Sequence, residues 1–236
     1  MITIKSESFI SEIGKREINE DSLQFQSGKF YLVCDGLGGN GNGQIASELV
    51  AETVKESLLK SKSILEAVQE AEKVLSSYKK KHPSTDYMAT TIAVAEILEN
   101  KILVSWAGDS RVYQFRDGKI IYKTNDHTLV SEAVNKGVLT AVEALFHPDA
   151  NGLTKSIKGA QNPVELDQIL IQDIKQNDYF LLCTDGALES FIDTDLETLF
   201  SESKSTNEII DELDKNCQIF SNDNYTAIVF QIDFTF

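Results

Sequence analysis

Four short aspartate turns constrain the fold of this chain more than any other feature of its 236 residues. Each stands at the boundary of a strand-like apolar run, and the four are Asp35-Gly36, Gly108-Asp109-Ser110, Asp185-Gly186 and Asp223-Asn224. Any single Asp-Gly pair is an ordinary turn former, because Asp bonds its own backbone and Gly accepts positive φ. Their shared position at strand boundaries instead indicates a pocket in which several carboxylates converge.

Converging carboxylates repel one another unless a cation neutralises them. Hard divalent ions that prefer oxygen ligands, Mg²⁺ or Mn²⁺, suit such a pocket. The chain has neither an HExxH motif nor paired CxxC motifs, so zinc chemistry is unsupported. No cysteine is followed closely by arginine, so a covalent cysteine route is unsupported as well. The sequence therefore predicts a magnesium or manganese site.

Composition argues against several classes of partner. The net charge of −15 disfavours nucleic acid and anionic membrane surfaces. No apolar run approaches the roughly 20 residues needed to span a bilayer, and no secretion signal is apparent at the N-terminus. The three cysteines lack CxxC spacing, which fits a reducing compartment. We expect a cytoplasmic monomer folded as one domain over residues 1–236, without nucleic-acid or membrane partners.

Hydrophobic patterning places strands in groups and helices in pairs. Strands are expected near Ile2–Phe9, Ser22–Phe25, Phe30–Cys34, Thr90–Ile97, Ile102–Trp106, Val112–Phe115, Gln168–Ile171, Tyr179–Cys183 and Ala227–Ile232. Apolar residues at helical spacing predict helices over 45–58, 64–78, 129–136 and 209–217. This order predicts an α+β fold with helices packed on antiparallel sheets. The segment Ala141–Gly159 has little periodicity and is expected to be irregular.

Within the glycine-rich stretch Gly36–Gly43, Gly38 to Gly43 has the spacing of a phosphate-binding P-loop. Gln44 and Ile45 stand where that motif needs Lys and Ser or Thr, so nothing would reach the β- and γ-phosphates. We reject the nucleotide-binding interpretation. With Asp35 at its head, the stretch fits a metal-binding loop better than a flexible turn.

The cluster Arg16–Asp21 precedes a predicted strand and is densely polar. It is either a solvated loop or part of the site. In the second case Arg16 could hold an anion through its bidentate fork, and Glu20 and Asp21 could hold metal-bound water.

Taken in order, these motifs resemble the protein phosphatase 2C family of metal-dependent Ser/Thr protein phosphatases. The match runs through nearly the whole chain, and its pieces are Arg16-x-x-x-Glu20-Asp21, Val33–Gly39, Ala89-Thr90-Thr91, Ala107–Arg111, Asp126-His127, His147-Pro148, Asn151, Leu153-Thr154, Cys183–Gly186 and Asp223–Thr226. Any one piece would be a weak signal, but their order is highly specific. Asp126-His127 and the pieces over 147–154 are more similar to bacterial members.

The resemblance implies an α-β-β-α sandwich of two antiparallel sheets flanked by helix pairs, with a two-ion Mn²⁺ or Mg²⁺ centre at one end. It implies that Asp35 bridges both ions, that the Gly36 carbonyl contacts one ion, and that Asp185 and Asp223 ligate the other. Glu20 and Asp21 would bind metal-bound water, and Arg16 would bind the phosphate. A weaker third ion is implied at Asp109 with Asp185. It further implies a flap-like segment over 141–159, with His127 and Lys155 in or near it.

The implied reaction is hydrolysis of phosphoserine and phosphothreonine in proteins by direct attack of a metal-bridging hydroxide, opposing a Ser/Thr kinase. Leu37 stands where animal relatives carry a histidine proposed as general acid, so the proton donor to the leaving alcohol stays open. Ala89 replaces a usual glycine, which predicts only a packing adjustment. Two alternatives remain: a pseudophosphatase that uses the fold for binding, and a hydrolase of a small phosphate ester. The full set of acidic positions speaks against the first, and a broad, shallow pocket would speak against the second.

Overall fold

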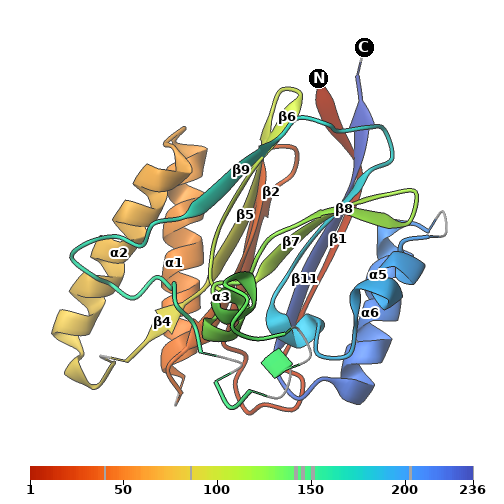
Figure 1. Cartoon of the computed structure of the whole chain (residues 1–236). Helices are drawn as coiled ribbons and strands as arrows, with labels where there is room; N and C mark the ends of the chain where they lie inside the picture. Colours follow the sequence, from red (N-terminus) through yellow and green to blue (C-terminus); the bar gives the residue numbers. More distant parts are fainter. Residues whose placement is uncertain are drawn as a thin grey trace.

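Two antiparallel sheets pack face to face, and helices cover the outer face of each, in the computed structural model of the chain (Figure 1). The structure describes residues 1–39, 41–85, 87–140, 143–144, 147–149, 152–201 and 204–235. Part of the predicted irregular segment 141–159, including Asn151, lies outside these residues. The four layers confirm the predicted α+β sandwich.

One sheet contains both ends of the chain and has the strand order β1-β11-β10-β7-β8. Its strands are β1 (Ile2–Glu12), β11 (Tyr225–Phe234), β10 (Tyr179–Cys183), β7 (Arg111–Arg116) and β8 (Lys119–Lys123). All neighbours are antiparallel, and Ile2 pairs with Phe234, so the first and last strands lie side by side. This pairing brings the segment that follows β1 beside the segment that precedes β11.

The second sheet has the strand order β2-β3-β5-β6-β9, with a short extra strand on β3. Its strands are β2 (Asp21–Gln26), β3 (Phe30–Leu37), β5 (Ile92–Leu98), β6 (Lys101–Ala107), β9 (Asp167–Ile171) and the extra β4 (Ala89–Thr90). The inner faces of the two sheets share a core of large side chains. Tyr31 and Phe230, from opposite sheets, stack with ring centroids 4.2 Å apart.

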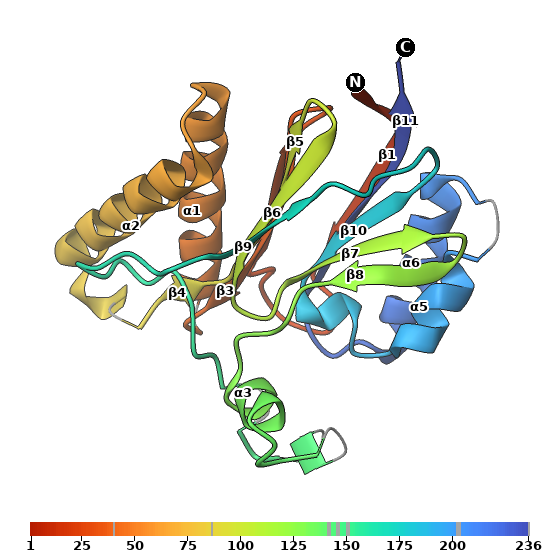
Figure 2. The same cartoon turned by 45° about the horizontal axis from the view of Figure 1, so that its top comes forward.

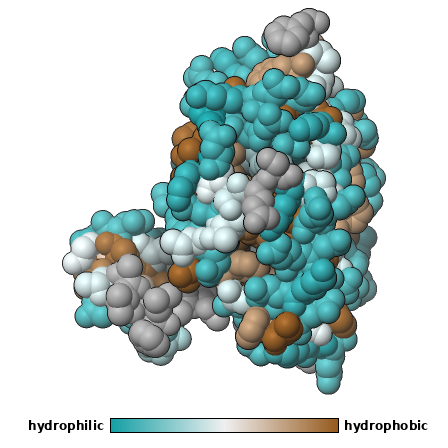
Figure 3. All heavy atoms as spheres, turned by 90° about the vertical axis from the view of Figure 1, so that its right-hand side faces the viewer, coloured by the Kyte–Doolittle hydropathy of each residue, from teal (hydrophilic) through white to brown (hydrophobic). Residues whose placement is uncertain are grey.

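Helices α1 (Asn42–Leu59) and α2 (Ile64–Lys81) cover the second sheet, and α5 (Asp193–Leu199) and α6 (Thr206–Phe220) cover the first (Figure 2). Helices α2 and α6 each begin with a capping box, in which a serine accepts the N–H of a glutamate that bonds back to it. The face over α5 and α6 is mostly hydrophilic with isolated apolar patches (Figure 3). Among the described residues, no helix combines the length and hydrophobicity needed to cross a membrane.

A further helix, α3 (Leu129–Asn135), lies outside the four layers, beside one end of the sandwich (Figure 2). The described part of the segment 141–159 is largely irregular, as predicted, but it is anchored at two places. Leu153 bridges to Thr128, and Ile157 exchanges backbone hydrogen bonds of 2.8 and 2.9 Å with Thr90. Ile157 is fully buried, so the end of this segment belongs to the core.

Several local predictions were wrong. The sequence prediction named neither β8 nor the short helix α5. Within the described residues, β8 pairs with β7 alone, and its side chains are at most half-buried. Asp35-Gly36 is not a turn, because β3 continues through it: Asp35 pairs with Asp21 and Gly36 with Thr90. A third strand, β4, extends the ladder there, and sequence alone does not show that partner.

Candidate metal centre

Five aspartates from different segments lie at one end of the sandwich. Asp35 follows the buried run Phe30–Cys34 of β3, and Asp21 begins β2 directly opposite it. The other three follow or precede strands, with Asp109 after β6, Asp185 in the short 3₁₀ turn after β10, and Asp223 just before β11. In antiparallel sheets the end of one strand lies beside the start of its neighbour. The strand order therefore collects these residues, here called the acidic cluster, at a single edge.

Burial and mutual repulsion both act on the acidic cluster. Burial raises the pKa of Asp21 to about 7, and the negative charges of Asp185 and Asp223 add to this rise. Burial also raises the pKa of Asp35 well above its usual range, with further increases from the charges of Asp21, Asp185 and Asp109. A site that disfavours its own negative charges in this way is suited to a divalent cation.

The two remaining buried members behave alike. Burial raises the pKa of Asp109 to about 7, with Asp185 and then Asp126 contributing negative charge. Burial also raises the pKa of Asp185, and the negative charge of Asp223 adds to this rise. Carboxyl groups that raise one another's pKa in this way are stabilised together by a cation. The donor set, made of carboxylate oxygens, has the chemistry that Mg²⁺ and Mn²⁺ prefer.

Within the described residues, no three Asp, Glu, His or Cys side chains are arranged so that they could coordinate one metal ion together. Asp223 instead pairs with Arg16, whose Nη2 lies 2.6 Å from Asp223 Oδ2. The second oxygen, Oδ1, accepts the backbone N–H of Asn224 at 2.8 Å. The chemistry and electrostatics of the acidic cluster fit the implied ions. Asp223 would have to release Arg16 in order to ligate an ion.

Hydroxyl groups behind the acidic cluster hold its backbone in place. Asp35 N donates to Thr91 Oγ1 at 2.9 Å, and Thr90 Oγ1 donates to Asp35 O at 2.8 Å. Thr91 Oγ1 also contacts Ser110 Oγ at 2.6 Å, which links Asp35 to the turn that carries Asp109. Thr184 Oγ1 donates to Asp21 Oδ2 at 2.8 Å. These contacts explain why the motif residues beside the aspartates are hydroxyl-bearing.

Asn224 holds the loop between β1 and β2, which carries Arg16 and Glu20. Its Nδ2 donates to Ile13 O at 2.8 Å and to Ile18 O at 2.9 Å, and its Oδ1 accepts Glu20 N at 2.9 Å. The side chain is buried. From the sequence, Asn224 belongs to a motif but has no assigned role, and only the pairing of β1 with β11 shows which loop it holds.

Two glycines let three backbone segments meet beside Glu20. A Cβ at Gly36 would lie 2.2 Å from Gly43 O and 2.5 Å from Glu20 O. A Cβ at Gly43 would lie 2.8 Å from the Glu20 carboxyl carbon. The absence of both atoms lets Glu20 Oε1 accept Gly43 N at 3.1 Å, near the start of α1. The glycine-rich stretch thus allows close packing of backbone, and Glu20 borders the acidic cluster.

The two residues expected near the flap lie beside the turn that carries Asp109. His127 is buried, its Nδ1 accepts Gly108 N at 3.1 Å, and its backbone N donates to Gly108 O at 2.9 Å. Its Nε2 lies 3.3 Å from Asp167 without the alignment of a good hydrogen bond. Burial lowers the pKa of His127, which agrees with a neutral ring whose Nδ1 is an acceptor. Lys155 pairs with Asp167 and not with the acidic cluster.

Known proteins similar to this chain identify its family. A family model described as protein phosphatase 2C matches residues 11–219. The chain belongs to the protein phosphatase 2C family. It is 26% identical over 215 residues to a serine/threonine phosphatase, stp, of Listeria monocytogenes, and the match covers 86% of this chain and 84% of that protein. The predicted family and enzyme class, a protein serine/threonine phosphatase, are confirmed.

Solved structures of the protein phosphatase 2C family superimpose over almost the whole chain. The serine/threonine phosphatase PstP/Ppp of Mycobacterium tuberculosis matches with a TM-score of 0.85 and 26% identity, covering 97% of this chain and 99% of that one. A catalytic domain of PstP in complex with two manganese ions matches with a TM-score of 0.83 and 25% identity, covering 99% and 100%. The family is metal-dependent, whereas the individual ligand roles in this chain remain predictions.

Proposed function

We propose that this enzyme removes phosphate from phosphoserine and phosphothreonine in proteins, with two Mn²⁺ or Mg²⁺ ions held by the acidic cluster. The observation that carries the proposal is the convergence of five aspartates, four of them with raised pKa values, at one end of the sandwich. The relatives named above are called serine/threonine phosphatases, which supports the same substrate class here. The phosphoproteins would be products of an opposing Ser/Thr kinase, and the enzyme would act as a monomer.

In this proposal the ligand roles follow the family pattern. Asp35 would contact both ions, the Gly36 carbonyl would contact one of them, and Asp185 and Asp223 would ligate the second. Glu20 and Asp21 would contact the ions through water, and Asp109 would hold a weaker third ion. Bound ions would supply a bridging hydroxide at neutral pH and neutralise the phosphoryl oxygens. The protein's own contribution is to hold the carboxylates in register through the hydroxyls of Thr90, Thr91 and Thr184.

The deciding experiment is hydrolysis of a phosphothreonine peptide with and without Mn²⁺, for the wild type and Asp35→Asn. The amide cannot balance two cations, so the variant should lose turnover and should bind Mn²⁺ more weakly by calorimetry. Wild-type activity in excess chelator, or full activity of Asp35→Asn, would remove the metal-dependent mechanism. Activity on small phosphate esters alone would indicate a metabolite phosphatase.

We expect Arg16 to bind the substrate phosphate. Its side chain is 57% exposed at the edge of the acidic cluster, so an incoming anion can reach it. Arg16→Ala should raise KM for the peptide, and kcat should fall as well if the grip tightens in the transition state. Arg16→Lys should rescue only in part, because the bidentate fork is lost. Unchanged kinetics in both variants would make Arg16 a surface residue.

A further inference from the structure

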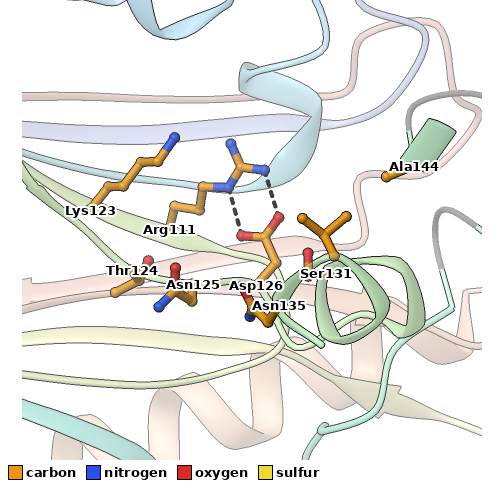
Figure 4. A pocket seen from close by; sticks show the side chains of 9 residues that line it. Arg111, Lys123, Thr124, Asn125, Asp126, Ser131, Asn135 and Ala144 are labelled. Carbon is orange, nitrogen blue, oxygen red and sulfur yellow. Dashed lines mark hydrogen bonds and ion pairs between the residues drawn. The ribbon is translucent and has the colours of Figure 1, made fainter. Parts of the chain in front are cut away.

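A pocket of about 230 Å³ lies between the β7–β8 strand pair and α3 (Figure 4). Its lining residues are Arg111, Lys123, Thr124, Asn125, Asp126, Ser131, Val134, Asn135 and Ala144. Arg111 follows Asp109 by two positions and pairs with Cys183 across β7 and β10. Asp126 directly precedes His127, whose backbone N donates to Gly108 O at 2.9 Å, so the pocket lies beside the turn that carries Asp109.

The charged groups in this pocket already have partners. Arg111 donates to both oxygens of Asp126, at 2.7 and 2.6 Å, and to the Tyr113 hydroxyl at 3.0 Å. Lys123 pairs with Asp193. Figure 4 shows the fork between Arg111 and Asp126 in the centre of the pocket. With each cation matched by a carboxylate, the pocket offers no surplus charge to a second phosphate or to an acidic or basic side chain.

The unused hydrogen-bonding groups are the neutral amides of Asn125 and Asn135, whose side chains bond to no described residue. Each offers both a donor and an acceptor, the combination that a peptide main chain also presents. The hydroxyl of Thr124, by contrast, accepts the N–H of Val112 and supports β7. Val134 and Ala144 add apolar wall. The volume suits one small side chain together with its main chain.

We propose that this pocket binds the peptide segment beside the phosphorylated residue, through main-chain hydrogen bonds to Asn125 and Asn135. It accepts an uncharged side chain next to the phosphorylated residue, because a charged one would be desolvated without a partner. This proposal rests on the proposed phosphoprotein phosphatase activity and adds a specificity site to it. The site would distinguish peptides by their flanking residues and would not contact a small aryl phosphate.

The test measures kcat and KM of the Asn125→Ala/Asn135→Ala double variant with a phosphothreonine peptide and with p-nitrophenyl phosphate, in the presence of Mn²⁺. Loss of two neutral hydrogen bonds should raise KM for the peptide by about tenfold. The KM for p-nitrophenyl phosphate should not change. Asn100→Ala, at an exposed position in the β5–β6 turn, is the matched control and should match the wild type on both substrates.

A second variant tests the volume of the pocket without removing an amide. Val134→Phe should fill it, and should again raise KM for the peptide alone. Peptides with Ala, Asn, Glu or Lys beside the phosphothreonine should show lower kcat/KM for the charged residues with the wild type. This difference should shrink in the double variant.

An unchanged peptide KM in both the double variant and Val134→Phe would overturn the proposal. Equal losses on peptide and p-nitrophenyl phosphate would also overturn it, because they would show that the pocket supports the metal centre. Failure of the wild type to hydrolyse any phosphopeptide would instead contradict the proposed function, so the two failures can be told apart.

Discussion

At the scale of single residues, buried polar side chains decide how the acidic cluster is held. Asn224 is the clearest example, since one amide group bonds the backbone of three residues in the loop between β1 and β2. Such a residue carries no charge and contacts no substrate, yet Arg16 and Glu20 depend on it for their positions. Its effect should therefore appear in stability as well as in catalysis.

We expect Asn224→Ala to lower the free energy of unfolding by about 3 kcal/mol, because three backbone groups lose their buried partner. Urea unfolding should show a lower midpoint with an unchanged slope. Asn100→Ala, exposed in the β5–β6 turn, is the control and should change stability by less than about 0.5 kcal/mol. An Asn224→Ala protein as stable as this control would contradict the anchoring role.

Glu96 predicts a pH effect away from the acidic cluster. It lies in β5 between Phe30 and Leu103, and its Oε1 is buried without a partner among the described residues. Burial raises the pKa of Glu96 from 4.5 to about 7. The folded state thus holds this proton more tightly than the unfolded state. Protonated Glu96 therefore stabilises the folded state fully below pH 4.5, and this stabilisation is lost as pH rises through about 7.

Glu96→Gln, a neutral mimic of the protonated acid, should therefore be more stable than the wild type at pH 8 and not at pH 4. We expect a gain of about 1 kcal/mol, allowing for partial solvent screening of this incompletely buried group. Chemical unfolding at several pH values measures it, with the exposed Glu52→Gln as control. A difference between wild type and Glu96→Gln that stays constant with pH would refute the assignment.

At the scale of secondary-structure elements, helix α2 anchors the segment that leads from residues 152–159 to β9. Glu72 is 1% exposed, and its carboxylate accepts Ala160 N at 3.0 Å and Val164 N at 3.2 Å. Glu72 thus accepts two backbone N–H groups of this irregular segment, in place of the carbonyl groups that a strand or helix would provide. Ile157, just before it, is held by Thr90 of β4, so the segment is fastened to both a helix and a sheet.

Glu72→Ala should destabilise the fold by about 2–4 kcal/mol, because it removes charged hydrogen bonds and leaves two backbone N–H groups without a partner. Hydrogen exchange should accelerate most at Ala160 and Val164. Lys73→Ala, at an exposed position of the same helix, is the matched control. Protection at the two amides equal to that in the control would show that Glu72 does not anchor the segment.

At the scale of the whole molecule, the sandwich is assembled around an unfavourable concentration of negative charge. The net charge is −15, and the acidic cluster joins both sheets at one end. Asp21 and Asp35 come from one sheet, whereas Asp185 and Asp223 flank strands of the other. A cation bound there would link the sheets, so metal binding and global stability should be coupled.

Mn²⁺ at about 100 times its Kd should stabilise the folded protein by about 2.7 kcal/mol per site, because it binds the native state and not the unfolded chain. Thermal unfolding should show a concentration-dependent rise in Tm that EDTA reverses and that Asp185→Asn reduces. Asp117→Asn, in the remote β7–β8 turn, should retain the full shift. A Tm independent of Mn²⁺ would contradict binding by the acidic cluster.

The sequence by itself determined the fold class, the family and the set of acidic residues. These properties are local: alternating and helical apolar patterns, turn residues, and motifs whose order along the chain is specific. Asp35, Asp185 and Asp223 could be predicted as candidate site residues because each stands beside a strand-like run. The two helix pairs could be predicted in large part because α1, α2 and α6 have apolar stripes, whereas the short α5 has too few turns to show one.

Only the tertiary structure decided which groups meet. The pairing of Asp21 with Asp35 is a matter of strand register, and the pairing of Arg16 with Asp223 spans 207 positions of sequence. The sequence predicts a turn at Asp35-Gly36, and this prediction is wrong because Gly36 pairs with β4. That strand lies more than fifty residues further along the chain, so a local pattern does not show it. Asn224, His127 and the pocket lined by Asn125 and Asn135 likewise acquire their roles through contacts between distant segments. Local patterns encode the conformation of a segment, but partner choice follows from the packing of all segments together.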